Sequence, residues 1–269
     1  MTKTKAPQVG LKFYPASHRY KLDGQWVPGV TTILGKAIPK PALTKWAAKS
    51  VAEFVAYNPD TVQNLWAAGD RAAIAALKEV PWQSRDDAAA RGTEVHDLAE
   101  RYLKGEEIHV PDSILGHVEA CAQFISDWGI KPILIEETVG SREHKYAGKL
   151  DLVADSKHAP RAIFDWKTTK SGIYFETAFQ LNAYAHAEFY GEDGNETPMS
   201  SVGIQDAYAV HIRADGYEVV PMEFGPHVFE EFLHLLASTQ IIKRAEGDWK
   251  VPGTGYRKVG LDGNGEPNE

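Results

Sequence analysis

Two apolar segments of the chain carry charged residues in their interiors. Asp151 lies within KLDLVA, and Asp165 and Lys167 lie within AIFDWK. Side chains two residues apart on a β-strand share a face, so Asp165 and Lys167 are expected to point the same way. If the two segments pair as an antiparallel hairpin, its connection is the polar stretch DSKHAPR. The midpoint between Asp151 and Asp165 falls inside that connection, which places the two acids opposite each other.

Facing carboxylates repel each other and raise the pKa of at least one of them, so a nearby cation is needed. Lys167 supplies one positive charge, and a bound metal ion would supply the rest. A dense set of hard oxygen ligands favours Mg²⁺ or Mn²⁺. The alternative is a solvated ladder of opposite charges on an exposed sheet face. These three residues alone do not decide between a metal site and that ladder.

Two helical segments hold further candidates. In RGTEVHDLAERYL, His96 and Glu100 are four residues apart, and His96 borders an apolar stripe of Val95, Leu98, Ala99 and Tyr102. A neutral imidazole at that border could reach a metal, although a histidine there is usually a boundary residue. In TAFQLNAYAHAEF, Gln180 and Tyr184 have the same spacing and are flanked by small alanines. As a lone signal, each pair is weak.

Hydrophobic periodicity predicts the elements that position these residues. We expect a hairpin over 18–34 with its turn at Asp23 and Gly24, and strands over 132–139, 146–154, 161–167, 202–212 and 217–224. Helices are expected over 42–57, 60–80, 82–105, 111–129, 175–191 and 227–247, with a capping pattern at Ser84 and Asp87. The fold class is therefore α/β (α+β): a mixed sheet flanked by helices, behind a helical N-terminal half. The expected division is 1–83, a core over 84–247, and a loose tail over 248–269.

Composition restricts the classes of protein. No apolar run approaches the ~18 residues of a membrane span, and MTKTKAPQVG is not a signal peptide. Cys121 is the only cysteine, which excludes an internal disulfide and favours a reducing cytoplasm. The net charge is −8, yet residues 1–50 hold nine basic residues against one acid, Asp23. This end is either a basic surface for phosphates or a solvated segment that binds nothing.

In chain order, these motifs read G-T-x-x-H in a helix, G-K-L-D in a strand, D-W-K in the next strand and Q-L-N-A-Y in the next helix. That ordered set, over roughly 84–190, resembles the RecB-like exonuclease branch of the PD-(D/E)XK nuclease superfamily. The opening HRYKLDGQWVPGVTTIL also resembles the start of phage-encoded nucleases in this branch. The resemblance implies a restriction-endonuclease-like core.

The resemblance also implies roles for individual residues. The metal ligands would be His96, Asp151, Asp165 and the backbone carbonyl of Trp166, and the cofactor would be Mg²⁺, with Mn²⁺ able to substitute. The catalytic set would be Asp151, Asp165 and Lys167, with Gln180 and Tyr184 positioning substrate or supporting the site. Supporting acids are sought among Glu136, Glu137 and Glu100.

The expected function is a metal-dependent DNA exonuclease, acting on single-stranded DNA or DNA ends in phage replication, recombination or repair. With Cys121 alone, the iron–sulfur cluster of some relatives is not expected. The chain has no Walker A pattern, so a helicase, recombinase or single-strand-binding protein would be a separate partner. No membrane is expected, and the location would be the cytoplasm, that of the host if phage-encoded. Alternatives are a structure-selective endonuclease on the same core, a catalytically silent DNA-binding module, and a different metal enzyme.

Overall fold

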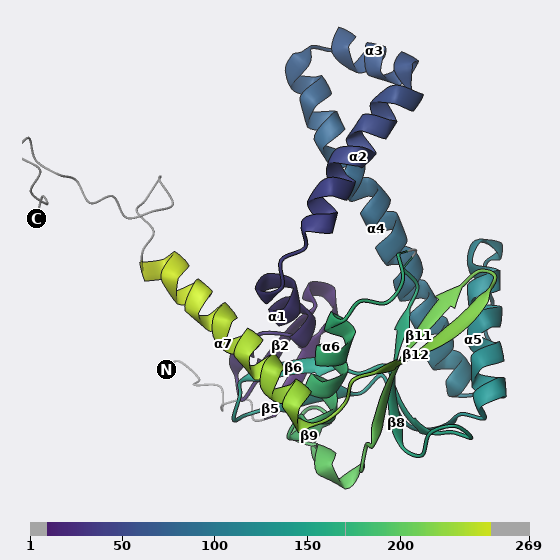
Figure 1. Ribbon diagram of the computed structural model, residues 1–269, viewed down its shortest axis with the longest axis vertical. Helices are drawn as coiled ribbons and strands as arrows, with labels where there is room; N and C mark the ends of the chain where they lie inside the picture. Colours follow the sequence, from purple (N-terminus) through teal and green to yellow (C-terminus); the bar gives the residue numbers. More distant parts are fainter. Residues whose placement is uncertain (1–9, 170, 249–269) are drawn as a thin grey trace, which may run out of the picture.

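The computed structural model describes residues 10–169 and 171–248 of the chain. It has a mixed α/β core from which a helical arm projects (Figure 1). The helices are α1 (Val30–Ala37), α2 (Pro41–Tyr57), α3 (Pro59–Ala67), α4 (Asp70–Leu103), α5 (Leu115–Trp128), α6 (Glu176–Ala185) and α7 (Pro226–Asp248). The strands are β1 (Leu11–Tyr14), β2 (Arg19–Leu22), β3 (Gln25–Val27), β4 (Lys131–Ile135), β5 (Thr138–Ser141), β6 (Tyr146–Lys149), β7 (Leu152–Asp155), β8 (Ala162–Lys167), β9 (Phe189–Tyr190), β10 (Thr197–Pro198), β11 (Asp206–Arg213) and β12 (Gly216–Met222).

The central sheet has five strands in the order β12-β11-β8-β7-β4. Strands β8 and β11 are parallel and the other neighbours are antiparallel, so the sheet is mixed. In the β7–β8 hairpin, Leu152 lies opposite Phe164 and Val153 opposite Ile163. This is the register expected from the sequence. It brings Asp151 to the end of the ladder, next in line to face Asp165.

Helices cover both faces of this sheet, so the predicted mixed α/β architecture is confirmed. Helix α5 and the C-terminal part of α4 lie on one face, where Phe164 and Trp166 pack with Phe124. Helices α1, α6 and α7 lie on the other, where Ile163 packs in a second apolar cluster with Phe232. Strand β8 therefore alternates its side chains between the two cores, as its sequence predicts.

A second sheet, in the order β10-β9-β5-β6, arises because two expected strands are each broken in the middle. The strand expected over 132–139 bends at Glu136, whose φ of 54° is left-handed, and the strand expected over 146–154 bends at Asp151. Two backbone hydrogen bonds keep these two segments paired across the bend. Glu136 N donates to Asp151 O at 2.8 Å, and Leu150 N donates to Glu137 O at 2.9 Å. Asp151 thus lies at a bend between two sheets, and the expectation of a strand interior is wrong.

Three other element boundaries differ from expectation. The helix expected over 175–191 ends at Ala185, because Phe189 and Tyr190 pair with β5 as strand β9. The turn at Asp23 and Gly24 is as predicted, and β3 follows it. The end of the expected hairpin, from Val30 on, instead forms α1, whose apolar residues Val30, Ile33 and Leu34 are buried. The helices expected over 60–80 and 82–105 are divided elsewhere: α3 ends at Ala67, Gly69 has a left-handed φ of 104°, and α4 runs from Asp70 through Pro81 to Leu103.

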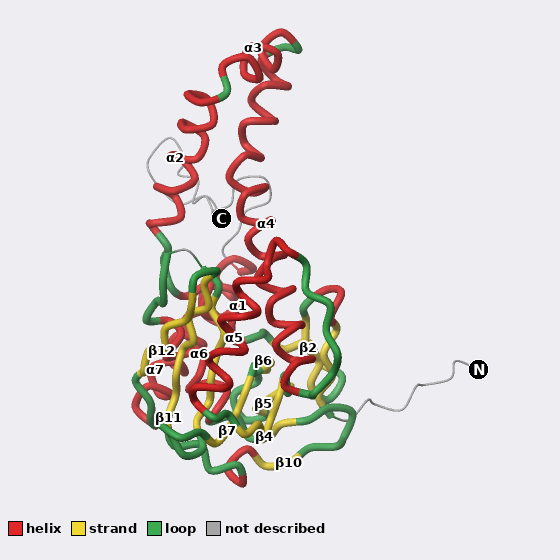
Figure 2. Tube along the Cα trace, turned by 90° about the vertical axis from the view of Figure 1, so that its right-hand side faces the viewer, coloured by secondary structure: helices red, strands yellow, loops and turns green. Residues whose placement is uncertain are grey.

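The arm consists of α2, α3 and the N-terminal part of α4, and it extends away from the sheets (Figure 2). The short sheet β1-β2-β3 and α1 pack on the core instead, beside β5 and β6. No helix among the described residues is both long and apolar enough to cross a membrane. The tail expected after Asp248 lies outside the described residues.

Candidate metal centre

Helix α4 brings His96 to the edge of the central sheet. Val95, Leu98 and Ala99 are buried, so the apolar stripe beside His96 anchors the helix as predicted, whereas Tyr102 is exposed. A Cβ atom on Gly92 would lie 3.1 Å from Thr168 Oγ1, so a glycine here lets α4 approach the end of β8 closely. The histidine ring then reaches the last residues of that strand.

The imidazole of His96 contacts three groups from the sheet. Its Nε2 lies 3.1 Å from the carbonyl oxygen of Trp166. Its Nδ1 lies 3.6 Å from Asp151 Oδ2 and 4.0 Å from Glu136 Oε1. The backbone N–H of Trp166 donates to Asp151 Oδ2 at 2.8 Å, which fixes the carboxylate. The bends at Glu136 and Asp151 therefore meet His96 of α4 at one point.

The donor set at this point suits a divalent cation. Within the described residues, His96, Glu136 and Asp151 each place one ligand atom so that these atoms lie within 4.8 Å of one another. Their side chains are 28%, 12% and 10% exposed, so the group is largely but not completely covered. Glu136 Oε1 is buried without a hydrogen-bond partner among these residues, which leaves an oxygen ready to coordinate. One nitrogen with carboxylate oxygens fits Mg²⁺ or Mn²⁺.

Electrostatics favour a cation as well. Burial, reinforced by the charge of Asp151, raises the pKa of Glu136 to about 7, although Lys149 pairs with Glu136 at 2.6 Å and opposes the rise. Burial and the charge of Asp165 likewise raise the pKa of Asp151. Burial lowers the pKa of His96, which keeps its imidazole neutral and able to act as a ligand. A positive charge nearby would therefore lower the free energy that is needed to ionise these acids.

Beside this point lies a second polar group centred on Asp165. Lys167 Nζ is 2.5 Å from Asp165 Oδ2 and 3.3 Å from Gln180 Oε1, and the amide of Gln180 donates to Asp165 Oδ1 at 2.7 Å. The same amide lies 3.4 Å from the Tyr184 hydroxyl. Burial would lower the pKa of Lys167, but Asp165 and Asp151 outweigh it, so the pKa is raised and the ammonium stays charged.

Close packing explains two of the motif residues. A Cβ atom on Gly148 would collide with the ring of Tyr184, so the glycine of G-K-L-D makes room for the tyrosine of Q-L-N-A-Y. Tyr184 is fully buried, and that burial raises its pKa well above the ordinary value. Helix α6 can therefore lie against β6 and hold Gln180 over β8.

All seven residues proposed from the sequence lie in two neighbouring groups that meet along strand β8, but their arrangement differs from the resemblance in one respect. The carboxylate of Asp165 is held by Lys167 and Gln180 and is not part of the group of three ligand atoms, whereas Glu136 is. Glu100 instead forms an ion pair with Lys104. Sequence reasoning missed Lys149, although it is the lysine of G-K-L-D and its spacing from Asp151 was available.

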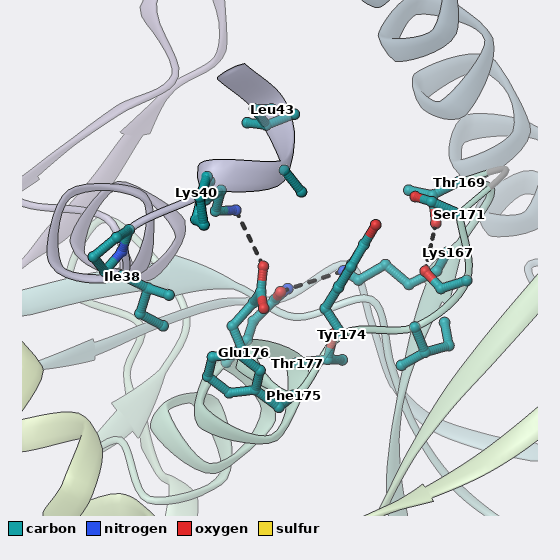
Figure 3. Close-up of a pocket in the computed structure, with 16 residues that line it drawn as sticks. Ile38, Lys40, Leu43, Lys167, Thr169, Ser171, Tyr174, Phe175, Glu176 and Thr177 are labelled. Atoms are coloured by element: carbon teal, nitrogen blue, oxygen red, sulfur yellow. Dashed lines mark hydrogen bonds and ion pairs between the residues drawn. The ribbon is translucent and has the colours of Figure 1, made fainter. Parts of the chain in front are cut away.

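Two neighbouring hollows open at the base of the arm, and Lys167 lines the first of them. The first, of about 510 Å³, lies between Lys167, Gln180, the start of α2 and residues 171–177 (Figure 3). The second, of about 680 Å³, lies between α2 and α4 and includes Arg85 and Arg91. Leu43 and Tyr174 line both, so the hollows adjoin. In the first, Lys40 pairs with Glu176 at 3.1 Å.

No protein-family model matches the chain, and no curated protein matches its sequence. A function is therefore proposed from the chemistry of the candidate metal centre and of the residues around it.

Proposed function

We propose that this protein is a metal-dependent deoxyribonuclease of the PD-(D/E)XK type that acts as an exonuclease on single-stranded DNA or DNA ends. One observation carries the proposal: His96, Glu136 and Asp151 converge within 4.8 Å, next to a partly buried, charged Lys167. Carboxylates with a neighbouring lysine suit phosphoryl chemistry, whereas zinc hydrolases that act on carbonyls usually need several histidines.

A phosphodiester is anionic and unreactive, so the site must supply a nucleophile and neutralise charge. A bound Mg²⁺ would acidify a water molecule and polarise a phosphoryl oxygen. His96, Glu136 and Asp151 would hold it, and the Trp166 carbonyl beside His96 is available as a further oxygen ligand. Lys167 would orient the attacking water or stabilise the charge that develops on the phosphoryl oxygens.

Gln180 holds the ion pair of Asp165 and Lys167 beside the proposed metal centre. Because its amide contacts both Asp165 and Lys167, it fixes the direction of the lysine and keeps its ammonium near the acids. Without Gln180, Lys167 would lose this hydrogen bond and could adopt other rotamers. We therefore assign Gln180 a positioning role, with Tyr184 packed behind it.

The hollows at the base of the arm support action on strand ends. They lead from Lys167 to the space between α2 and α4, and their described lining includes Lys40, Arg85 and Arg91 with the aromatic ring of Tyr174. Cationic grooves with aromatic rings bind single strands without reading their sequence. A strand that enters between the two helices of the arm would reach the metal centre end first, as an exonuclease requires.

The test is cleavage of linear single-stranded DNA labelled at either end, with Mg²⁺, with Mn²⁺ and with EDTA. We expect a metal-dependent ladder, whose direction gives the polarity. Asp165→Asn should reduce the rate at least about a hundredfold, because Lys167 loses its partner at the site. The matched control is Asp155→Asn, on the same hairpin but paired with Arg161, which should retain activity.

Other outcomes separate the alternatives. Equal cleavage of circular and linear single strands would replace the exonuclease with an endonuclease on the same core. Binding without cleavage under every metal condition would leave a catalytically silent DNA-binding module. Activity of Asp165→Asn at the parent rate would refute the assignment of the site.

A further inference from the structure

The short sheet β1-β2-β3 has one buried and one exposed face. Residues that lie opposite each other in antiparallel strands share a face, and so do residues two apart. Lys12 pairs with Lys21, which pairs with Trp26, and Tyr14 pairs with Arg19. These five side chains therefore share one face, called here the Trp26 face.

The opposite face is already occupied by the core. Leu11, Tyr20 and Leu22 are buried there and pack with Ala147 and Phe189 of the second sheet. The chain continues from β3 to Gly29, which bridges to Ala147. The sheet is thus anchored on its inner side, beside β5 and β6 (Figure 2). The Trp26 face is the side turned away from the core.

The Trp26 face combines aromatic rings with cations. The Trp26 ring lies 5.2 Å from that of Tyr14, at an interplanar angle of 54°. The guanidinium of Arg19 lies 3.9 Å from the centre of the Trp26 ring, and Lys21 Nζ lies 5.0 Å from it. Trp26 is still 47% exposed, although an indole of that size is usually covered.

The charge of this face opposes that of the whole chain. Its five residues include three cations and no acid, in a protein of net charge −8. Lys12 reaches Asp193 at 3.8 Å, and Asp23 at the β2–β3 turn is paired with Arg142. Two more acids lie beside the sheet, where Glu192 and Glu196 accept hydrogen bonds from backbone N–H groups of β1, and Glu196 also pairs with Arg142. A positive face on an acidic protein selects for a polyanion, and exposed rings select for one that carries flat bases.

We propose that the Trp26 face is a second nucleic-acid surface, separate from the metal centre, that binds a single strand. The bases would stack on Trp26, Tyr14 and the outer plane of the Arg19 guanidinium, and the phosphates would contact Lys12 and Lys21. Stacking tolerates any base, so this binding would be independent of sequence. The ligand class follows from the nuclease function proposed above, and to that extent the inference rests on it.

The test is binding of fluorescein-labelled single-stranded DNA, measured by anisotropy in EDTA so that no cleavage occurs. Trp26→Ala should raise Kd by on the order of tenfold, and Trp26→Phe should restore most of the affinity. The matched control is Trp66→Ala on α3, because Trp66 is also 47% exposed. That control should leave Kd unchanged.

The salt dependence gives an independent readout. Lys21→Gln should lower the slope of log K against log salt by about 0.7, the value for one lost phosphate contact on a single strand. Thermal unfolding of each variant checks that the fold is kept. Equal Kd and slope for Trp26→Ala, Lys21→Gln and the parent would overturn the Trp26 face, and so would an absence of binding by the parent. Neither result bears on the proposed nuclease activity, which the separate cleavage assay tests.

Discussion

At the scale of single residues, the site holds carboxylates that are buried close together, with lysines paired beside them. Glu136 and Asp151 are almost covered. Besides burial, the charge of Asp151 raises the pKa of Glu136, and the charge of Asp165 raises the pKa of Asp151. Lys149 and Lys167 bring compensation from the two sides, through Glu136 and Asp165 respectively. His96, Glu136 and Asp151 place their ligand atoms close enough together that they could hold a cation.

This arrangement predicts an unusual dependence of stability on pH in EDTA. The pKa of Glu136 is raised to about 7 in the folded protein, so between its ordinary pKa and 7 the folded state holds a proton that the unfolded state has lost. The free energy of unfolding should therefore fall as the pH rises from 5 to 8, by up to about 3 kcal/mol. Denaturant unfolding at several pH values measures it.

Variants and metal make this prediction specific. Glu136→Gln should reduce the decline, whose remainder comes from Asp151 because its pKa is also raised, and Glu94→Gln, an exposed acid on α4, should not reduce it. At pH 8, Mg²⁺ at a hundred times its Kd should restore about 2.7 kcal/mol to the parent. A free energy of unfolding that is constant from pH 5 to 8 would contradict the assigned burial of charge.

At the scale of elements, the site depends on close packing between α6 and β6. Gly148→Ala would press a methyl group into the ring of Tyr184, with the cost of an overpacked core, about 1–3 kcal/mol. Displacement of Tyr184 would also disturb Gln180, so the rate of DNA cleavage should fall. Thermal unfolding and the cleavage assay measure the two effects.

A second glycine offers the control. Gly35 lies in helix α1, with no atom within 4 Å of an added Cβ, so Gly35→Ala should be neutral or stabilise by up to about 1 kcal/mol. If both alanines had the same small effect, the packing of Tyr184 on Gly148 would not be what holds α6 in place.

At the scale of the whole molecule, the arm and the core meet at the hollows beside Lys167. Tyr174 lines both hollows and is 46% exposed. Tyr174→Ala should raise KM for linear single-stranded DNA about tenfold and change kcat less, because the ring would hold the strand and not the reacting phosphate.

The comparison residue is Tyr57, 78% exposed at the end of α2 and outside both hollows. Tyr57→Ala should leave KM at the parent value. Steady-state kinetics on end-labelled strands of several lengths makes the measurement. A larger effect from Tyr57 than from Tyr174 would place the strand on the outside of the arm.

Local sequence determined much of the protein. The alternation of AIFDWK sets Asp165 and Lys167 on one face of β8, and the short polar connection sets the register that brings Asp151 towards Asp165. These features follow from strand geometry within about twenty residues of chain, without reference to anything distant. The apolar stripe beside His96 is of the same kind.

Tertiary structure decided the rest, because the remaining features depend on contacts between distant segments. The left-handed bend at Glu136 forms where the hairpin leaves one sheet for another, and it brings Glu136 to His96, forty residues earlier in the chain. Phe189 and Tyr190 look helical by periodicity, yet pairing with β5 makes them a strand. The Trp26 face likewise exists because the core covers the other side of its sheet. Residue types and their spacing indicated which chemistry to expect, and long-range packing decided which acids lie together beside His96.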